Sequence, residues 1–183
     1  MSKLKNEPRL WKDFVPLAFH VDYWDRLGWR DPFAAKEWTA RQYHYSDSWK
    51  SESVYTPGFV LDGREWMERS VPAASSEKTG ALKVSIANGK IIAEFVPANG
   101  ATKDVDLHVA TLGFDLTTKI TAGENSGRNL GQDFVVLSLT NQKMSDGKAE
   151  FAFNPDSRAG AIAAWINSPN QIDPIQVVGG WLR

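Results

Sequence analysis

One stretch decides the predicted fold class: Phe14-Val-Pro-Leu-Ala-Phe-His-Val-Asp-Tyr-Trp-Asp25. Before His20 almost every side chain is apolar, a pattern typical of a strand that is buried on both faces in a parallel sheet. Strand alternation then places His20, Asp22 and Trp24 on one face at the carboxyl end. Because open α/β sheets bind ligands at the carboxyl ends of their strands, we expect a binding or catalytic site at this point.

Composition and charge exclude several classes of protein. The chain has 183 residues and 42% hydrophobic content, which is enough to bury a core. A formal net charge of -1 gives no overall field for a polyanion, so no nucleic-acid partner is predicted. No apolar run is long enough for a membrane span, and residues 1–8 lack the apolar region of a signal peptide.

The absence of cysteine limits the chemistry of these residues. With no Cys in the sequence, disulfides, thiolate metal sites and thiol exchange are excluded for this chain. No cofactor motif is present either. The Gly-rich segment 123–128 lacks the Lys-Ser/Thr pair of a phosphate-binding loop, so we predict no bound cofactor.

The first part of the chain is predicted to mix helix and strand. Residues 1–12 resemble the end of an amphipathic helix, and Asp31-Pro32 predicts the start of a helix over residues 32–50. Asp62-Gly63 predicts a hairpin turn. Residues 68–80 are small, polar and aperiodic, as in a linker, so we place a first domain at residues 1–70.

The second part, residues 71–183, is predicted to be a β-sandwich. Asn88-Gly89 between two alternating segments predicts a hairpin with a primed turn. Short alternating segments separated by turn residues continue to the end of the chain, which favours an antiparallel sandwich of about eight strands. The further predicted strands are 105–114, 118–122, 134–139, 149–153, 161–166 and 175–178.

Each candidate site residue also has a structural interpretation. His20 is either a hydrogen-bonded core histidine or a catalytic group. Asp22 is either a cap for the following loop or a site residue. His20, Asp22 and Asp25 do not have the spacing of a known metal motif, so no metal site is predicted. Trp24 is either part of a binding surface or a cover for the core.

Several segments together resemble one bacterial family. They are Phe19-His-Val-Asp-Tyr-Trp-Asp25, Leu27-Gly-Trp-Arg-Asp-Pro-Phe33, Ser53-Val-Tyr-Thr-Pro57 and Val60-Leu-Asp-Gly-Arg64, with Ala122-Gly-Glu-Asn-Ser-Gly-Arg128 and Asp133-Phe-Val-Val136 further on. The chain is similar to domain of unknown function 1223, a family of exported thioredoxin-like proteins whose function is not established. Where Gln132 stands, family members often carry His.

The resemblance implies a thioredoxin-like α/β domain that lacks its first strand and a Cys-x-x-Cys segment. It implies that Thr56 and Pro57 form a cis-proline site facing that segment, and that a longer native form is exported to the periplasm. The fold class expected from both lines of reasoning is α/β plus all-β: an incomplete thioredoxin-like domain followed by an antiparallel β-sandwich.

Two functions follow from these expectations. The first is a thioredoxin-like protein that is redox-inactive as written, whose longer family form is a thiol-disulfide oxidoreductase with His20 and Asp22 as candidate catalytic residues. The second is a non-catalytic binding module of the bacterial envelope that uses the sandwich, with Trp24, Thr56 and Pro57 as candidate binding residues. A protein or small-molecule ligand is expected, and an uncovered apolar strand edge predicts a homodimer.

Overall fold

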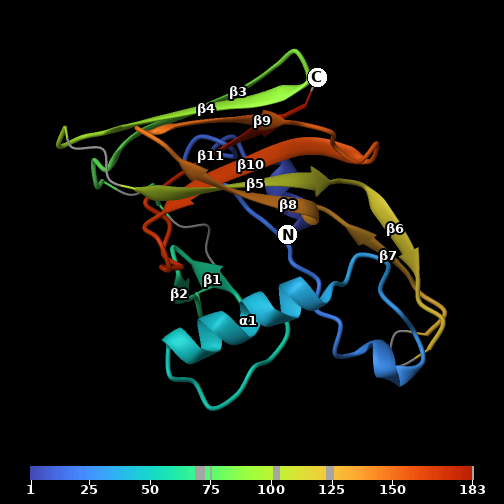
Figure 1. Cartoon of the computed structure of the whole chain (residues 1–183). Coiled ribbons are helices and arrows are strands. Elements are labelled where there is room, and N and C mark those ends of the chain that lie inside the picture. The colour runs from blue at the N-terminus through green and yellow to red at the C-terminus, as the bar shows by residue number, and fades with distance from the viewer. Residues whose placement is uncertain (69–72, 75, 101–103, 123–125, 183) are drawn as a thin grey trace.

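The computed structural model describes residues 1–68, 73–74, 76–100, 104–122 and 126–182 and consists mainly of β-structure (Figure 1). Within these residues the strands form four antiparallel sheets, and one segment forms an α-helix. The elements are α1 (Lys36–Ser48), β1 (Val60–Leu61), β2 (Arg64–Glu65), β3 (Gly80–Ala87), β4 (Lys90–Pro97), β5 (Val105–Gly113), β6 (Leu116–Lys119), β7 (Asn129–Gln132), β8 (Val135–Met144), β9 (Lys148–Ala152), β10 (Ala159–Asn167) and β11 (Gln176–Trp181).

The two larger sheets face each other across a shared apolar core. One has the strand order β11-β10-β5-β8 and the other the order β3-β4-β9. Alternation along β4 buries every second residue, so Ile91, Ala93 and Phe95 point toward the larger sheet. They meet side chains of β5 and β10, among them Leu107 and Ile166, both fully buried.

The opposite face of the four-stranded sheet is covered by the first part of the chain. Its buried residues include Leu112 and Trp165, and the half-buried side chains of Val15, Leu17 and Phe19 pack against them. α1 lies on this side as well, as Figure 1 shows. The molecule therefore has three layers, with the four-stranded sheet in the middle.

Both predicted hairpin turns are confirmed. Asn88 and Gly89 have φ values of 52° and 68° and connect β3 to β4. Asp62 and Gly63, with φ values of 48° and 83°, connect β1 to β2. Glycine is required at the second position of this turn, because a Cβ on Gly63 would lie 1.8 Å from Asp173 Oδ1.

β5 and β8 continue as a second ribbon, β6 and β7, after a bend in both strands. The bend lies at Asp115 and Phe134, which have φ values of 51° and 60°. Asp133 is buried there and accepts a hydrogen bond from the Asp115 amide at 2.9 Å. Lys5 forms ion pairs with both carboxylates, so the amino-terminal turn is held against the bend.

The predicted fold class is wrong. Residues 14–25 do not form a central parallel strand in a thioredoxin-like domain: they are extended or irregular and half-buried, apart from the exposed Trp24. Isolated parallel bridges join Ala18 to Val135 and His20 to Ala34. The apolar run arises because this segment covers a sheet face, and the sheet beneath it is antiparallel.

Element boundaries differ from the predictions in the first part of the chain. α1 begins at Lys36, four residues after the predicted start, and residues 2–6 form a short 3-10 helix. The strands expected beyond residue 80 are found, with shifted ends. The predicted domain boundary at residues 70–71 lies outside the described residues.

Candidate functional site

The candidate catalytic residue His20 is held by a carboxylate that the sequence analysis assigned to another role. His20 Nδ1 lies 2.6 Å from Asp31 Oδ2, and both side chains are largely buried. The other Asp31 oxygen accepts a hydrogen bond from the Phe33 amide at 2.9 Å, as in an Asx turn. Asp31 therefore does not cap α1, whose N-cap residue is Ala35.

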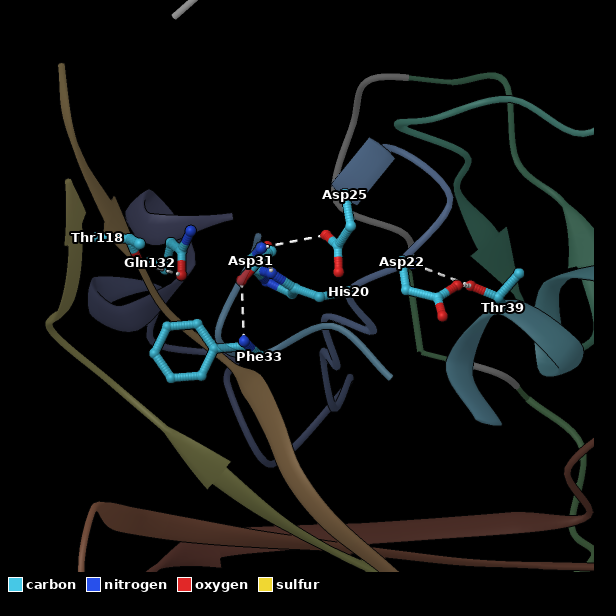
Figure 2. A network of polar contacts seen from close by, with 8 residues as sticks. All are labelled: His20, Asp22, Asp25, Asp31, Phe33, Thr39, Thr118 and Gln132. Atoms are coloured by element: carbon cyan, nitrogen blue, oxygen red, sulfur yellow. Dashed lines mark hydrogen bonds and ion pairs between the residues drawn. The ribbon is translucent and has the colours of Figure 1, made fainter. Parts of the chain in front are cut away.

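Asp22 is bound to the helix rather than to His20 (Figure 2). The Thr39 hydroxyl donates a hydrogen bond to Asp22 Oδ1 at 2.6 Å and accepts one from the Asp22 amide at 3.0 Å. Thr39 is buried in α1, so this reciprocal pair fixes the chain against the helix. Of the two interpretations of Asp22, the geometry favours the structural one.

The loop between Asp25 and Asp31 contributes a further hydrogen bond beside His20. Asp25 Oδ1 accepts a hydrogen bond from the Asp31 amide at 3.2 Å. A carboxylate that orients an imidazole is the arrangement of a general base, but such a base needs a group from which to take a proton. In the described residues no hydroxyl is hydrogen-bonded to His20, so no activated nucleophile is assembled.

Metal binding finds no support in this network. The described part of the chain contains no group of three or more His, Asp or Glu side chains arranged to hold an ion, and Cys is absent from the sequence. Thr118 and Gln132 lie on the neighbouring ribbon in Figure 2 and bond to each other at 3.3 Å. No hydrogen bond between described residues joins them to His20.

The candidate binding residue Trp24 lies on the surface. Its side chain is about half exposed, the Tyr23 ring lies 5.5 Å away, and the Arg26 guanidinium is 6.0 Å from the ring centroid. The second tryptophan of this loop, Trp29, donates its indole N–H to the Lys119 carbonyl at 3.0 Å. Trp29 thus attaches the loop to β6, while Trp24 has no such role.

Thr56 and Pro57 are exposed, and the peptide bond between them is cis. The loop that carries them is attached to the helix, because Gln42 Nε2 donates a hydrogen bond to the Tyr55 carbonyl at 2.7 Å. The structure therefore separates the predicted site residues: His20 and Asp22 have different partners, Trp24 lies on the surface, and Thr56 and Pro57 lie in this loop.

Large apolar side chains accompany this loop. Tyr55, Phe59, Val60 and Met67 are 46%, 50%, 43% and 77% exposed. We call these four residues the 55–67 surface. The Tyr55 hydroxyl donates a hydrogen bond to Glu65 at 2.6 Å and lies 3.6 Å from the Met67 sulfur, which holds the loop against the β1–β2 hairpin.

The backbone beneath the 55–67 surface is fixed at two further points. The Trp49 indole N–H donates to the Gly63 carbonyl at 2.7 Å, and the Trp66 amide donates to the Phe59 carbonyl at 2.8 Å. The Glu65 carboxylate beside Tyr55 raises the pKa of that phenol, so the phenol stays protonated and remains a donor at neutral pH.

Sequence reasoning missed the residues that complete these groups. Asp31 and Thr39 lie 11 and 17 positions from their partners, and no local pattern relates residues at such separations. It also missed a polar cluster on β5 and β8, where His108 Nδ1 lies 2.6 Å from Asn141 Oδ1. The sequence predicted a strand over residues 105–114 but gave no indication that β8 lies beside it.

Fold and site together define a mainly β protein in which an irregular first segment carries a hydrogen-bonded polar network around His20 and Asp22. Residues 1–166 match the family model described as protein of unknown function, DUF1223, and the chain belongs to this family. The predicted family is thereby confirmed, whereas its thioredoxin-like character and export are not. A search of curated proteins found no match to this sequence.

A solved structure with a similar fold comes from Agrobacterium tumefaciens. It is an X-ray crystal structure of a structural-genomics target, with a TM-score of 0.66 and 22% sequence identity, and the match covers 92% of this chain and 79% of that chain. At this identity the likeness concerns the fold alone. In the described residues no helix has the length and apolar character needed to cross a membrane.

Proposed function

We propose that this chain is a non-catalytic module that binds another protein through the 55–67 surface. The observation that carries the proposal is the concentration of large, exposed apolar side chains in one short segment. Exposed apolar groups gathered in this way are typical of protein interaction sites. The hydrogen bonds of Gln42, Trp49 and Tyr55 hold the segment in place, so little order has to be gained on binding.

The charge around the 55–67 surface indicates the kind of partner. Glu52, Asp62 and Glu65 lie in or beside the segment, with Arg64 as the basic residue among them. Glu52 and Glu65 are exposed. The partner surface is therefore expected to combine apolar side chains with a basic rim, because complementary charge favours encounter and fixes orientation.

Catalysis has weaker support than binding. His20 and Asp22 are engaged with Asp31 and Thr39, and no thiol is present to attack a disulfide. Thiol exchange by a longer family member, and its export, stay predictions that nothing in the described residues favours. For this chain we expect no turnover in an insulin-reduction assay, and turnover above a protein-free control would contradict the non-catalytic assignment.

Site-specific photo-crosslinking in the native cells tests the binding proposal. A photoreactive residue in place of Phe59 should give one discrete adduct, while the same residue in place of the exposed Lys148 should not. The purified partner identified from this adduct should then bind the double variant F59S/M67S at least about tenfold more weakly than the unmodified chain, as expected when anchoring side chains are lost.

The double variant I92S/V96S is the matched control, because Ile92 and Val96 are also large and exposed but lie on β4. Equal affinity of both double variants would overturn the proposal, as would the absence of a Phe59-specific adduct. Self-association that F59S/M67S abolishes would also overturn it, since the surface would then join two copies of the chain. Sedimentation of the unmodified protein separates that outcome from binding to a different partner.

A further inference from the structure

An open cavity of about 320 Å³ lies at the surface where β5 begins and β8 ends, and the residues that line it are all of polar or charged types, those from β8 being exposed. Asp106 and His108 come from β5, and Asn141, Gln142 and Lys143 come from β8. These residues share no member with the 55–67 surface. The cavity has to be explained separately from the protein-binding proposal.

Two opposite charges face each other in this cavity without pairing. Asp106 and Lys143 are direct neighbours across the antiparallel strands. Side chains at such positions are close enough to form an ion pair, and opposite charges there usually stabilise a sheet. Yet among the described residues neither side chain has an ion-pair partner within 4.0 Å. In the other large sheet, by contrast, Lys90 of β4 and Glu150 of β9 meet at 2.7 Å.

His108 forms a fixed wall beside these charges. Its ring stacks on Trp165 with centroids 5.1 Å apart and planes 12° apart. Burial lowers the pKa of His108, and the nearby Arg41 lowers it further while hydrogen bonding to Asn141 opposes the shift, so the ring is neutral at pH 7. With Asn141 Oδ1 as the acceptor, Nδ1 carries the proton.

The same hydrogen bond orients the Asn141 amide. Its oxygen is engaged by His108, so its NH₂ group remains as a donor, and no hydrogen bond from it to a described residue is present. On the face of His108 the cavity therefore offers one carboxylate, one ammonium group and the Asn141 amide. Gln142 is the cross-strand neighbour of Leu107, so its side chain lies on the other face of the sheet. Its lining carries no net charge, since His108 is neutral and Asp106 balances Lys143.

We propose that this cavity binds a small zwitterion of the amino-acid class, whose ammonium group pairs with Asp106 and whose carboxylate pairs with Lys143. The NH₂ group of Asn141, on the same face of the sheet, supplies a hydrogen bond to the same carboxylate. A ligand with one charge only would leave Asp106 or Lys143 without a partner, so both charges are needed for full affinity. The volume lies at the lower end of the range for ligand pockets, which fits a molecule of this size.

NMR titration of the full chain with three matched probes tests this proposal. The probes are alanine, alaninamide, which lacks the carboxylate, and N-acetylalanine, which lacks the ammonium group. Alanine should give saturable shifts at the backbone amides of residues 106–108 and 141–143. The two single-charge probes should bind at least about tenfold more weakly, as should alanine to D106N and K143M, since each loses one charge-assisted contact.

K148M is the matched control, because Lys148 is an exposed lysine on β9 that does not line the cavity. It should bind alanine as the unmodified chain does, and K143R should retain part of the affinity. Equal shifts with all three probes would overturn the proposal, as would the absence of saturation. If D106N fails to fold, the K143M and probe comparisons decide the question, and unchanged alanine binding by K143M would refute it.

Discussion

Residues 14–68 and residues 80–182 both bury apolar side chains, but their backbones are hydrogen-bonded in different ways. In the second region strands of 4 to 10 residues satisfy their backbone groups in antiparallel ladders. In the first, strands are two residues long, and an extended segment lies on a sheet that the other region supplies. Burying apolar side chains therefore does not require the segment itself to be a strand in a sheet.

The hydrogen bonds of residues 14–25 show how an irregular segment is held in place. The Ala18 amide donates to the Phe134 carbonyl at 2.8 Å, and the Ala18 carbonyl accepts from the Val136 amide at 3.0 Å. The His20 carbonyl accepts from the Ala35 amide at 3.2 Å. Single contacts to different elements thus replace a continuous ladder, and we expect this region to open at a lower free energy than the core between the sheets.

The largest loss of stability should follow from removing a buried side chain from the core between the two large sheets. Leu107→Ala removes a side chain with no exposed surface and should lower the free energy of unfolding by about 2–5 kcal/mol. Leu17→Ala removes the same atoms from the half-buried cover and should cost less, about 1–2 kcal/mol. Urea denaturation of the two variants measures the difference, and equal losses would contradict the distinction between the regions.

A second, smaller loss of stability should appear where the amino-terminal turn is held against the bend at Asp133. Asp133 has a side chain 5% exposed and binds Lys5 at 2.9 Å. Burial alone would raise the pKa of Asp133, but the Asp115 amide, Ser2 and Lys5 lower it below its usual value. Asp133→Asn should therefore lower the free energy of unfolding by about 2 kcal/mol at pH 7, since a hydrogen-bonded buried charge is lost.

The pH dependence of this loss has a definite sign. A carboxyl group with a lowered pKa in the folded state stabilises the protein fully above its unfolded pKa of about 4, and this stabilisation disappears as the pH falls through the folded value. The difference between the unmodified chain and Asp133→Asn should thus be constant near neutral pH and shrink in acid. Asp146→Asn, in an exposed turn, is the control and should change stability little at any pH.

The sequence predicted local features well and the partners of its apolar segments poorly. Asn88-Gly89 and Asp62-Gly63 were identified because each dipeptide by itself favours a turn with positive φ. The run before His20 was misread because a continuous apolar stretch fits both a doubly buried strand and a segment lying on a sheet face. Choosing between them required the location of Phe134 and Trp165, which lie more than a hundred residues away.

The candidate site shows the same limit at the level of single groups. His20 and Asp22 could be identified as polar residues at the end of an apolar run, but their partners Asp31 and Thr39 could not. The bend in the chain after Asp25 brings Asp31 back to His20, and that bend depends on Gly28, whose φ is 92°. A pattern in the sequence indicates which residues are polar, whereas the path of the loop determines which of them meet.

The smallest loss of stability is expected in residues 14–68, and it tests whether this region unfolds separately from the β-sheet core. Thr39→Val keeps the shape of the side chain but removes the hydroxyl that donates to Asp22 Oδ1 and accepts from the Asp22 amide. We expect a loss of about 1 kcal/mol in the free energy of unfolding, and faster amide hydrogen exchange confined to residues around Asp22 and the start of α1. Thr140→Val, on the exposed face of β8, should leave both measurements unchanged. If Thr39→Val also accelerated exchange in β5 and β10, the network around Asp22 would belong to the same cooperative unit as the core, and the division of the molecule into a cover and a β-sheet core would have to be abandoned.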